Sequence, residues 1–82
     1  MIELTIVRPT QKKVFSIVWL EVDTADVGNF VIKRGHAPMI LAIAPKMPIT
    51  VLLSSGKQEL IEVKNSGFLH VQRDALTLLL NA

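Results

Sequence analysis

The sequence predicts an all-β fold of about eight to ten short strands, arranged as a sandwich or a barrel. Val, Ile, Leu, Thr and Phe dominate the chain. Turn residues recur about every eight to twelve positions, which is the strand spacing of sandwiches and barrels. A chain of 82 residues corresponds to one domain, residues 1–82, and no repeat or linker divides it.

Runs rich in β-branched, aliphatic and aromatic residues define the expected strands. Pro9-Thr10-Gln11 and Asp26-Val27-Gly28 supply turns, and Ser55-Gly56 is typical of a two-residue hairpin turn. Residues 39–44 are apolar, but the run is too short for its periodicity to separate a strand from a helical turn. We place the strands at residues 2–7, 14–20, 22–24, 29–33, 49–54, 57–63, 68–72 and 76–80.

The chain is more apolar than a free-standing domain of this size requires. Hydrophobic residues make up 50% of it, and its mean hydropathy is +0.44. A small domain cannot bury that much apolar surface, so part of it is expected on a face that meets a partner. In the last strand Leu76, Leu78 and Leu80 point to one side, so either Leu79 lies on the opposite, otherwise polar side or both faces of this strand are covered.

Composition argues against several functional classes. With no cysteine and only His36 and His70, we expect no metal site and no thiolate chemistry. No serine lies in a Gly-x-Ser-x-Gly setting and no phosphate-binding glycine loop is present, so we expect neither a catalytic residue nor a cofactor. The net charge is +2 and the pI is about 9.3. The basic residues are scattered except at Lys12-Lys13 and Lys33-Arg34, which does not favour nucleic-acid binding.

Targeting and membrane signals are also not evident in the sequence. The longest apolar stretches are far shorter than the roughly 20 residues of a membrane-spanning helix. The start of the chain, Met1-Ile2-Glu3-Leu4, lacks the basic region and apolar core of a secretory signal. We therefore expect a protein of the cytoplasmic side.

Residues 28–38 form the most distinctive segment of the chain. Phe30 and Ile32 are expected to point to one face of a short strand. Gly35 can supply the positive φ that a type II turn requires at its third position. His36 follows that turn directly, and a histidine at such a position often simply hydrogen-bonds neighbouring backbone.

The residues of this segment follow the pattern Gly-x-Phe-x-Ile-x-x-Gly-His-Ala-Pro. Four further blocks flank it in a fixed order: Leu4-Thr5-Ile6-Val7, Val14-Phe15-Ser16, and the segments at 66–71 and 74–79. Together these blocks resemble the amino-terminal β-sandwich of the F-type ATP synthase epsilon subunit. The resemblance covers essentially the whole chain.

The resemblance implies a flattened β-sandwich or barrel of two packed, mostly antiparallel sheets. It also implies a non-catalytic central-stalk subunit that couples the gamma subunit to the c-subunit ring of a proton-translocating ATP synthase. The expected location is peripheral, at the cytoplasmic side of the bacterial inner (plasma) membrane, with no direct small-molecule ligand. The segment facing gamma and the ring would comprise Asn29, Phe30, Ile32, Lys33, Arg34, Gly35, His36, Ala37 and Pro38.

Two departures from the family pattern affect function. Lys33-Arg34 replace an apolar residue and a proline, so that the segment becomes more basic. The sequence ends at Ala82, where the family begins a helical hairpin that carries ATP binding and inhibition of hydrolysis, so we expect neither activity here. The alternative is a free-standing small β-barrel adaptor or nucleic-acid-binding module, for which the basic pI is the support.

Overall fold

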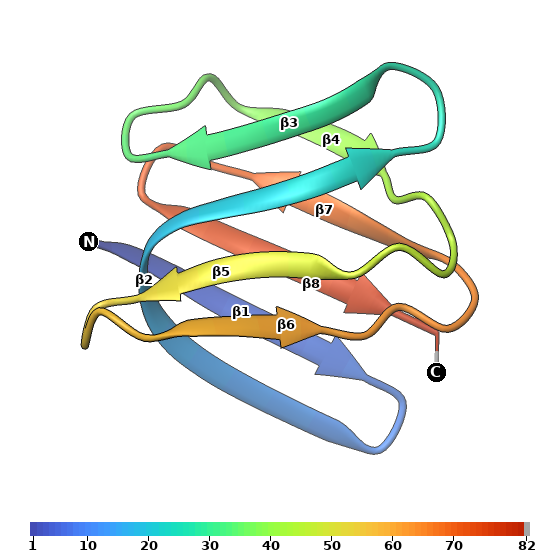
Figure 1. Ribbon diagram of the computed structural model, residues 1–82, viewed down its shortest axis with the longest axis horizontal. Coiled ribbons are helices and arrows are strands. Elements are labelled where there is room, and N and C mark those ends of the chain that lie inside the picture. The colour runs from blue at the N-terminus through green and yellow to red at the C-terminus, as the bar shows by residue number, and fades with distance from the viewer. Residues whose placement is uncertain (82) are drawn as a thin grey trace.

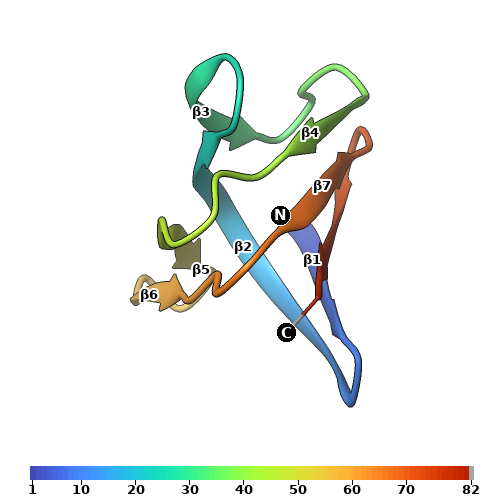
Figure 2. The same ribbon diagram turned by 90° about the vertical axis from the view of Figure 1, so that its right-hand side faces the viewer.

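Strand β2 (Gln11–Thr24) is the longest element and belongs to both layers of a β-sandwich. The computed structural model describes residues 1–81. The first half of β2 pairs with β1 (Ile2–Arg8), and its second half lies between β3 (Gly28–Lys33) and β5 (Ile49–Leu53). Its register with β5 shifts between Ile17 and Trp19, and this bulge bends β2 from one layer into the other (Figure 2).

The other strands complete two unequal layers (Figure 1). They are β4 (Met39–Ala42), β6 (Gln58–Ile61), β7 (Gly67–Val71) and β8 (Ala75–Leu80). One layer has the order β4-β7-β8-β1-β2 and the other the order β3-β2-β5-β6. Every pair is antiparallel except β1–β8, which is parallel. The domain measures 28 × 28 × 19 Å, and its short axis fits two sheets about 10 Å apart with their outer side chains. The predicted flattened, mostly antiparallel sandwich is confirmed.

One side of the sandwich is closed by backbone bonds between the layers. Thr24 at the end of β2 forms a bridge with Ile43, just after β4. The amide of Ala44 donates to the carbonyl of Asp23 at 2.9 Å, and the amide of Ala25 donates to the carbonyl of Ala42 at 3.0 Å. Across the domain, β6 ends its layer with β5 as its only strand partner among residues 1–81. The sandwich is therefore closed on the side of β4 and open on the side of β6.

The core is made of aliphatic side chains that alternate along the strands. In β8, Leu76, Leu78 and Leu80 are buried while Leu79 is 46% exposed, as predicted. Phe15 and Phe30 are partly buried and pack against the rim of this core. Its members are Ile2, Leu4, Ile6, Ile17, Leu20, Val22, Ile32, Leu41, Ile43, Ile49, Val51, Ile61, Val63, Leu69, Val71, Leu76, Leu78 and Leu80.

Two predicted boundaries were wrong. The strands expected at 14–20 and 22–24 are one strand, because half-buried Glu21 lies between buried Leu20 and Val22 and continues the two-residue alternation. The β5–β6 turn has three residues, 54–56, since the amide of Gly56 donates to the carbonyl of Leu53 and Leu53 pairs with Lys57. With Gly56 at φ +92°, this is a type I turn followed by a glycine bulge. The ambiguous segment at 39–44 contains a strand, β4.

Candidate partner-binding site

The β3–β4 connection contains the turn that the sequence predicted. The amide of His36 donates to the carbonyl of Lys33 at 3.2 Å, and Gly35 has φ +81° at the third position of the turn. This is type II geometry, which favours glycine at that position because a side chain is strained there. The turn projects at the same end of the sandwich as the N-terminus and the β7–β8 turn, on the left in Figure 1.

The β7–β8 turn anchors the β3–β4 turn. The amide of Gly35 donates to the carbonyl of Arg73 at 3.2 Å, and the Arg34 guanidinium lies 3.6 Å from the Asp74 carboxylate. The amide of Glu3 also donates to the carbonyl of Asp74 at 3.2 Å, which fixes the β7–β8 turn to β1. The Arg34–Asp74 side chains are 72% and 58% exposed, so their ion pair contributes little to stability. The backbone bonds hold the two turns in register.

Cationic side chains gather at this end of the molecule. Lys33, Arg34 and Arg73 come from the two adjoining turns and are all exposed, with Asp74 the acid among them. Sequence reasoning singled out Lys33 and Arg34 but missed Arg73, because its position depends on the packing of β7–β8 against β3–β4. The arrangement presents positive charge on a fixed backbone.

The remaining predicted site residues have different environments. Ile32 is 0% exposed, so its side chain is a core residue and not a surface contact. Phe30 is half-buried and packs on the core, and the side-chain amide of Asn29 donates to the Asp23 carboxylate at 3.2 Å. Ala37 and Pro38 are exposed as the chain enters β4. Partner contact by the exposed members of the segment stays a prediction.

His36 has the backbone interaction typical of a turn histidine. Its Nδ1 lies 2.9 Å from the carbonyl oxygen of Ala37. Because a carbonyl can only accept, Nδ1 carries the proton in this contact. The bond holds the imidazole over the chain as it leaves the turn, and the Nε2 side of the ring remains available for a partner.

Replacing Gly35 with alanine is expected to lower the free energy of unfolding by about 1–2 kcal/mol, the usual cost of a left-handed conformation for a residue with a Cβ. Nothing lies within 4 Å of a Cβ built at Gly35, so strain and not a clash causes the loss. Gly35→Asn should lose less, because asparagine tolerates positive φ. Urea denaturation measures both variants, and an alanine variant as stable as the parent would contradict the turn assignment.

A second surface was not located from the sequence. The outer face of the β4-β7-β8-β1-β2 layer carries Ile40, Phe68, Leu79 and Val14, which are 68%, 51%, 46% and 55% exposed. We call it the outer apolar face. Phe68 pairs directly with Leu79, and half-buried Val7 continues the row on β1. The apolar composition predicted such a surface and Leu79 marked one position, but its extent depends on which strands are neighbours.

Neither a metal site nor a membrane-spanning helix is formed by the part of the chain that the structure describes. Within residues 1–81, no three His, Asp or Glu side chains gather in a way that would hold a metal ion. The same residues form no helix long and apolar enough to cross a membrane.

Comparison with known families identifies the fold. The sequence matches the family described as "ATP synthase, Delta/Epsilon chain, beta-sandwich domain" over residues 1–82. The chain belongs to this family. The predicted resemblance to the epsilon-subunit β-sandwich is thus confirmed by membership of this family, and the two turns and the outer apolar face are surfaces of a delta/epsilon β-sandwich. No curated protein matched the chain.

Solved structures contain the same delta/epsilon β-sandwich fold. A chain of the Euglena gracilis mitochondrial ATP synthase, solved by cryo-EM with OSCP, F1 and the c-ring, has a TM-score of 0.84 and 20% identity. That match covers 99% of this chain and 51% of that chain. A chain of the Tetrahymena thermophila mitochondrial ATP synthase central stalk and c-ring has a TM-score of 0.77 and 14% identity, with 99% and 63% covered. This sequence therefore spans between half and two thirds of the length of either chain.

Proposed function

We propose that this domain is a non-catalytic coupling element of the ATP synthase central stalk, joining the gamma subunit to the c-subunit ring. The proposal rests on the family match over residues 1–82. Similar chains occur in assemblies described as central stalk and c-ring. In this role the domain binds its partners through fixed surfaces and leaves ATP chemistry to other subunits.

Two surfaces support the proposal. The β3–β4 turn is cross-braced to the β7–β8 turn by backbone hydrogen bonds, so the exposed residues of segment 28–38 sit on a rigid support. The outer apolar face begins directly after that segment, at Ile40 on β4. An interface with an apolar centre and a charged rim is the usual design of a stable protein contact. We assign the charged turns to the c-ring and the base of gamma, and the outer apolar face to the remaining stalk contact.

Co-purification tests the proposal directly. Tagged domain, co-expressed with the gamma subunit and c-ring of the same organism, should retain both after washing. Phe68→Lys, placed in the centre of the outer apolar face, should reduce retention, while Met47→Lys, exposed in the β4–β5 connection, serves as the control. The proposal would be contradicted if the Phe68→Lys variant retained both partners as well as the parent domain does. It would also be contradicted if the parent domain retained neither partner. Salt-dependent binding of single-stranded oligonucleotides in place of gamma would support the alternative nucleic-acid module.

The double variant Lys33→Leu/Arg34→Pro should weaken assembly more at low salt than at high salt. If Lys33 and Arg34 face the ring, its loop carries a compensating acid, and attraction between exposed charges is screened by salt. Proline is compatible with the second position of the type II turn, so the fold should persist. Assembly is measured by co-purification across a salt series.

The matched control for this variant is Lys46→Leu/Lys64→Leu. Lys46 and Lys64 are exposed and lie at the opposite end of the sandwich, by the β4–β5 and β6–β7 connections (Figure 1). This control also removes two positive charges, and it should leave assembly unchanged. Equal assembly of the test variant at every salt concentration would show that Lys33 and Arg34 are solvated turn residues.

A further inference from the structure

The two layers of the sandwich do not cover each other completely. The β1–β2 hairpin extends past β6, the last strand of the shorter layer (Figure 1). The inner face of this hairpin therefore has no strand opposite part of it. A cleft of about 350 Å³ fills the space between the hairpin and the β5–β6 hairpin.

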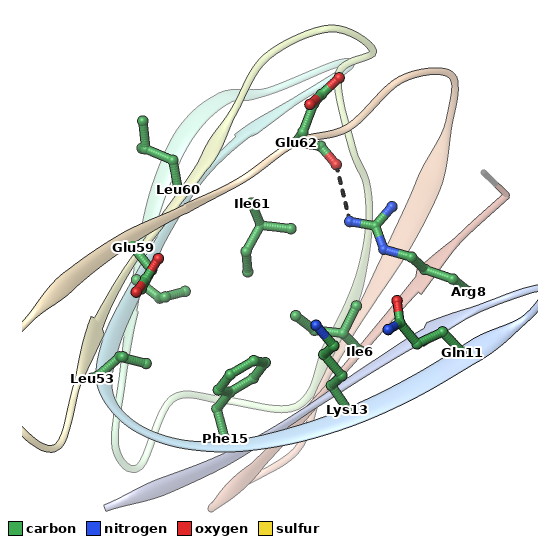
Figure 3. Close-up of a pocket in the computed structure, with 11 residues that line it drawn as sticks. Ile6, Arg8, Gln11, Lys13, Phe15, Leu53, Glu59, Leu60, Ile61 and Glu62 are labelled. Carbon is green, nitrogen blue, oxygen red and sulfur yellow. Dashed lines mark hydrogen bonds between the residues drawn. The ribbon is translucent and has the colours of Figure 1, made fainter.

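The walls of this cleft are apolar at the bottom and charged at the mouth. Ile6 and Phe15 project into it from the β1–β2 hairpin, and Ile61 projects from β6 (Figure 3). Lys13 pairs with Ile6 and lies two residues before Phe15, and Arg8 lies two residues after Ile6, so both cations occupy inward-facing positions of the hairpin. Apolar side chains below charged ones suit an amphipathic occupant.

The free edge of β6 forms one side of the same cleft. The amide of Leu53 donates to the carbonyl of Lys57 at 2.8 Å. In an antiparallel ladder the hydrogen-bonded positions alternate, so the backbone groups of Glu59 and Ile61 also point towards β5. The amides and carbonyls of Gln58 and Leu60 then point away from β5, towards the open edge. The Arg8 guanidinium donates to the next outward carbonyl, that of Glu62, at 3.3 Å. The edge therefore offers two consecutive hydrogen-bonding positions to an added strand.

Charge determines which strand fits. The Glu59 carboxylate at the mouth already lies 3.5 Å from the ammonium of Lys57. Lys13 points into the cleft from the facing wall (Figure 3), and no carboxylate of residues 1–81 lies within ion-pair distance of it. A carboxylate beside Lys13 and aliphatic groups beside Phe15 and Ile61 would complete the cleft.

We propose that β6 accepts an extended segment of a partner protein, with alternating apolar and acidic residues, as a fifth strand of the β3-β2-β5-β6 layer. The added strand pairs with Gln58 and Leu60, and its inward side chains cover the inner face of the β1–β2 hairpin. Strand addition of this kind takes affinity from main-chain bonds and specificity from alternate side chains. A second copy of this domain is disfavoured, because its own β1–β2 hairpin would enter the space that the first hairpin occupies.

A titration of the ¹⁵N-labelled domain tests the proposal, whether or not the stalk function holds. The probe is the capped peptide Ac-Val-Thr-Asp-Thr-Val-Thr-NH₂, whose valines and aspartate share one face. We expect saturable shifts at the amides of Gln58, Leu60, Lys13 and Phe15, and slowed hydrogen exchange at Gln58 and Leu60. The same peptide N-methylated at its first two threonines, which face β6, should bind at least about tenfold more weakly, because it cannot form the ladder.

Two pairs of variants separate the ladder from the charge. Leu60→Pro removes an amide that points to the open edge and makes no bond to β5, so an edge strand tolerates the change. This variant should bind the peptide at least about tenfold more weakly. Leu60→Thr keeps the amide and should keep the affinity. The Lys13→Glu variant should bind the aspartate peptide about fivefold more weakly. It should prefer a peptide in which lysine replaces the aspartate. Thermal melts confirm that each variant is folded.

Three results would overturn the proposal. The first is the lack of any saturable shift at millimolar peptide. The second is affinity unchanged by both Leu60→Pro and Lys13→Glu. The third is a dimer in which the Gln58 and Leu60 amides are already protected before peptide is added, since a second copy would then occupy the edge.

Discussion

Replacing Gly67 with alanine is expected to destabilise the domain by about 3 kcal/mol, at the upper end of the usual cost of overpacking. Gly67 is buried at the start of β7 and pairs with Leu80. A Cβ at this position would lie 2.5 Å from the backbone oxygen of Leu79 and 2.7 Å from a methyl group of Leu80. The carbonyl belongs to the β7–β8 ladder, so relief requires the two strands to separate. Urea denaturation measures the loss.

Gly56→Ala is the matched control for Gly67→Ala. Gly56 has φ +92° and open space around its Cβ direction, so alanine there adds strain of about 1–2 kcal/mol and no clash. Adding Leu80→Ala to Gly67→Ala removes the methyl contact and leaves the carbonyl contact, and should not restore stability. A Gly67→Ala variant as stable as Gly56→Ala would show that the close approach of β7 and β8 relaxes at little cost.

Replacing Leu20 with alanine is expected to lower the free energy of unfolding by about 3–5 kcal/mol, the cost of a large cavity in a packed core. Leu20 is 0% exposed, just after the bend of β2, and pairs with buried Ile32 and Val51 on its two sides. A domain of this size has only about 3–5 kcal/mol of stability from its core. The variant should therefore be largely unfolded at 25 °C, which circular dichroism and NMR dispersion will show.

Val18→Ala controls for the loss of an aliphatic side chain on β2. Val18 lies two residues before Leu20 and is 41% exposed, so its removal should change stability by no more than about 0.5 kcal/mol. If Leu20→Ala and Val18→Ala were equally stable, β2 would not be the strand that joins the two layers of the core.

The same architecture suits the coupling role that we propose. Segment 28–38 is held at both ends by strands and in the middle by the β7–β8 turn, through the Gly35–Arg73 bond. Force applied to the turn is therefore transmitted to β1, because the β7–β8 turn is bonded to Glu3. Local flexing of an isolated loop would absorb such force, and the cross-bracing prevents it.

Features set by local chemistry were predicted from the sequence. The alternation of Leu76, Leu78 and Leu80 with Leu79 follows from the two-residue period of a strand, and the burial of each agrees with it. Gly35 was assigned a positive φ because a type II turn favours glycine there, and its φ is +81°. The backbone contact of His36 follows from its place after the same turn. The family resemblance also needed only the order of residues along the chain.

Features set by pairing between distant segments could not be predicted. The alternation of Leu20, Glu21 and Val22 permits one continuous strand, but whether β2 continues through Glu21 depends on β3 and β5 bonding to its two edges. The same applies to the predicted site. Ile32 became a core residue and Arg73 joined the charged end only when β3 and the β7–β8 turn came together.

The sequence by itself determined the strand content, the turn at Gly35 and membership of the delta/epsilon β-sandwich family, because these depend on side-chain alternation, backbone torsion and residue order. The tertiary structure alone decided which side chains share a surface. The outer apolar face exists because β8 lies between β7 and β1. The free edge of β6 exists because the β3-β2-β5-β6 layer ends at β6, while the β1–β2 hairpin of the other layer extends past it. The packing of the whole core determines which strands are neighbours, and the sequence of a single segment does not indicate them.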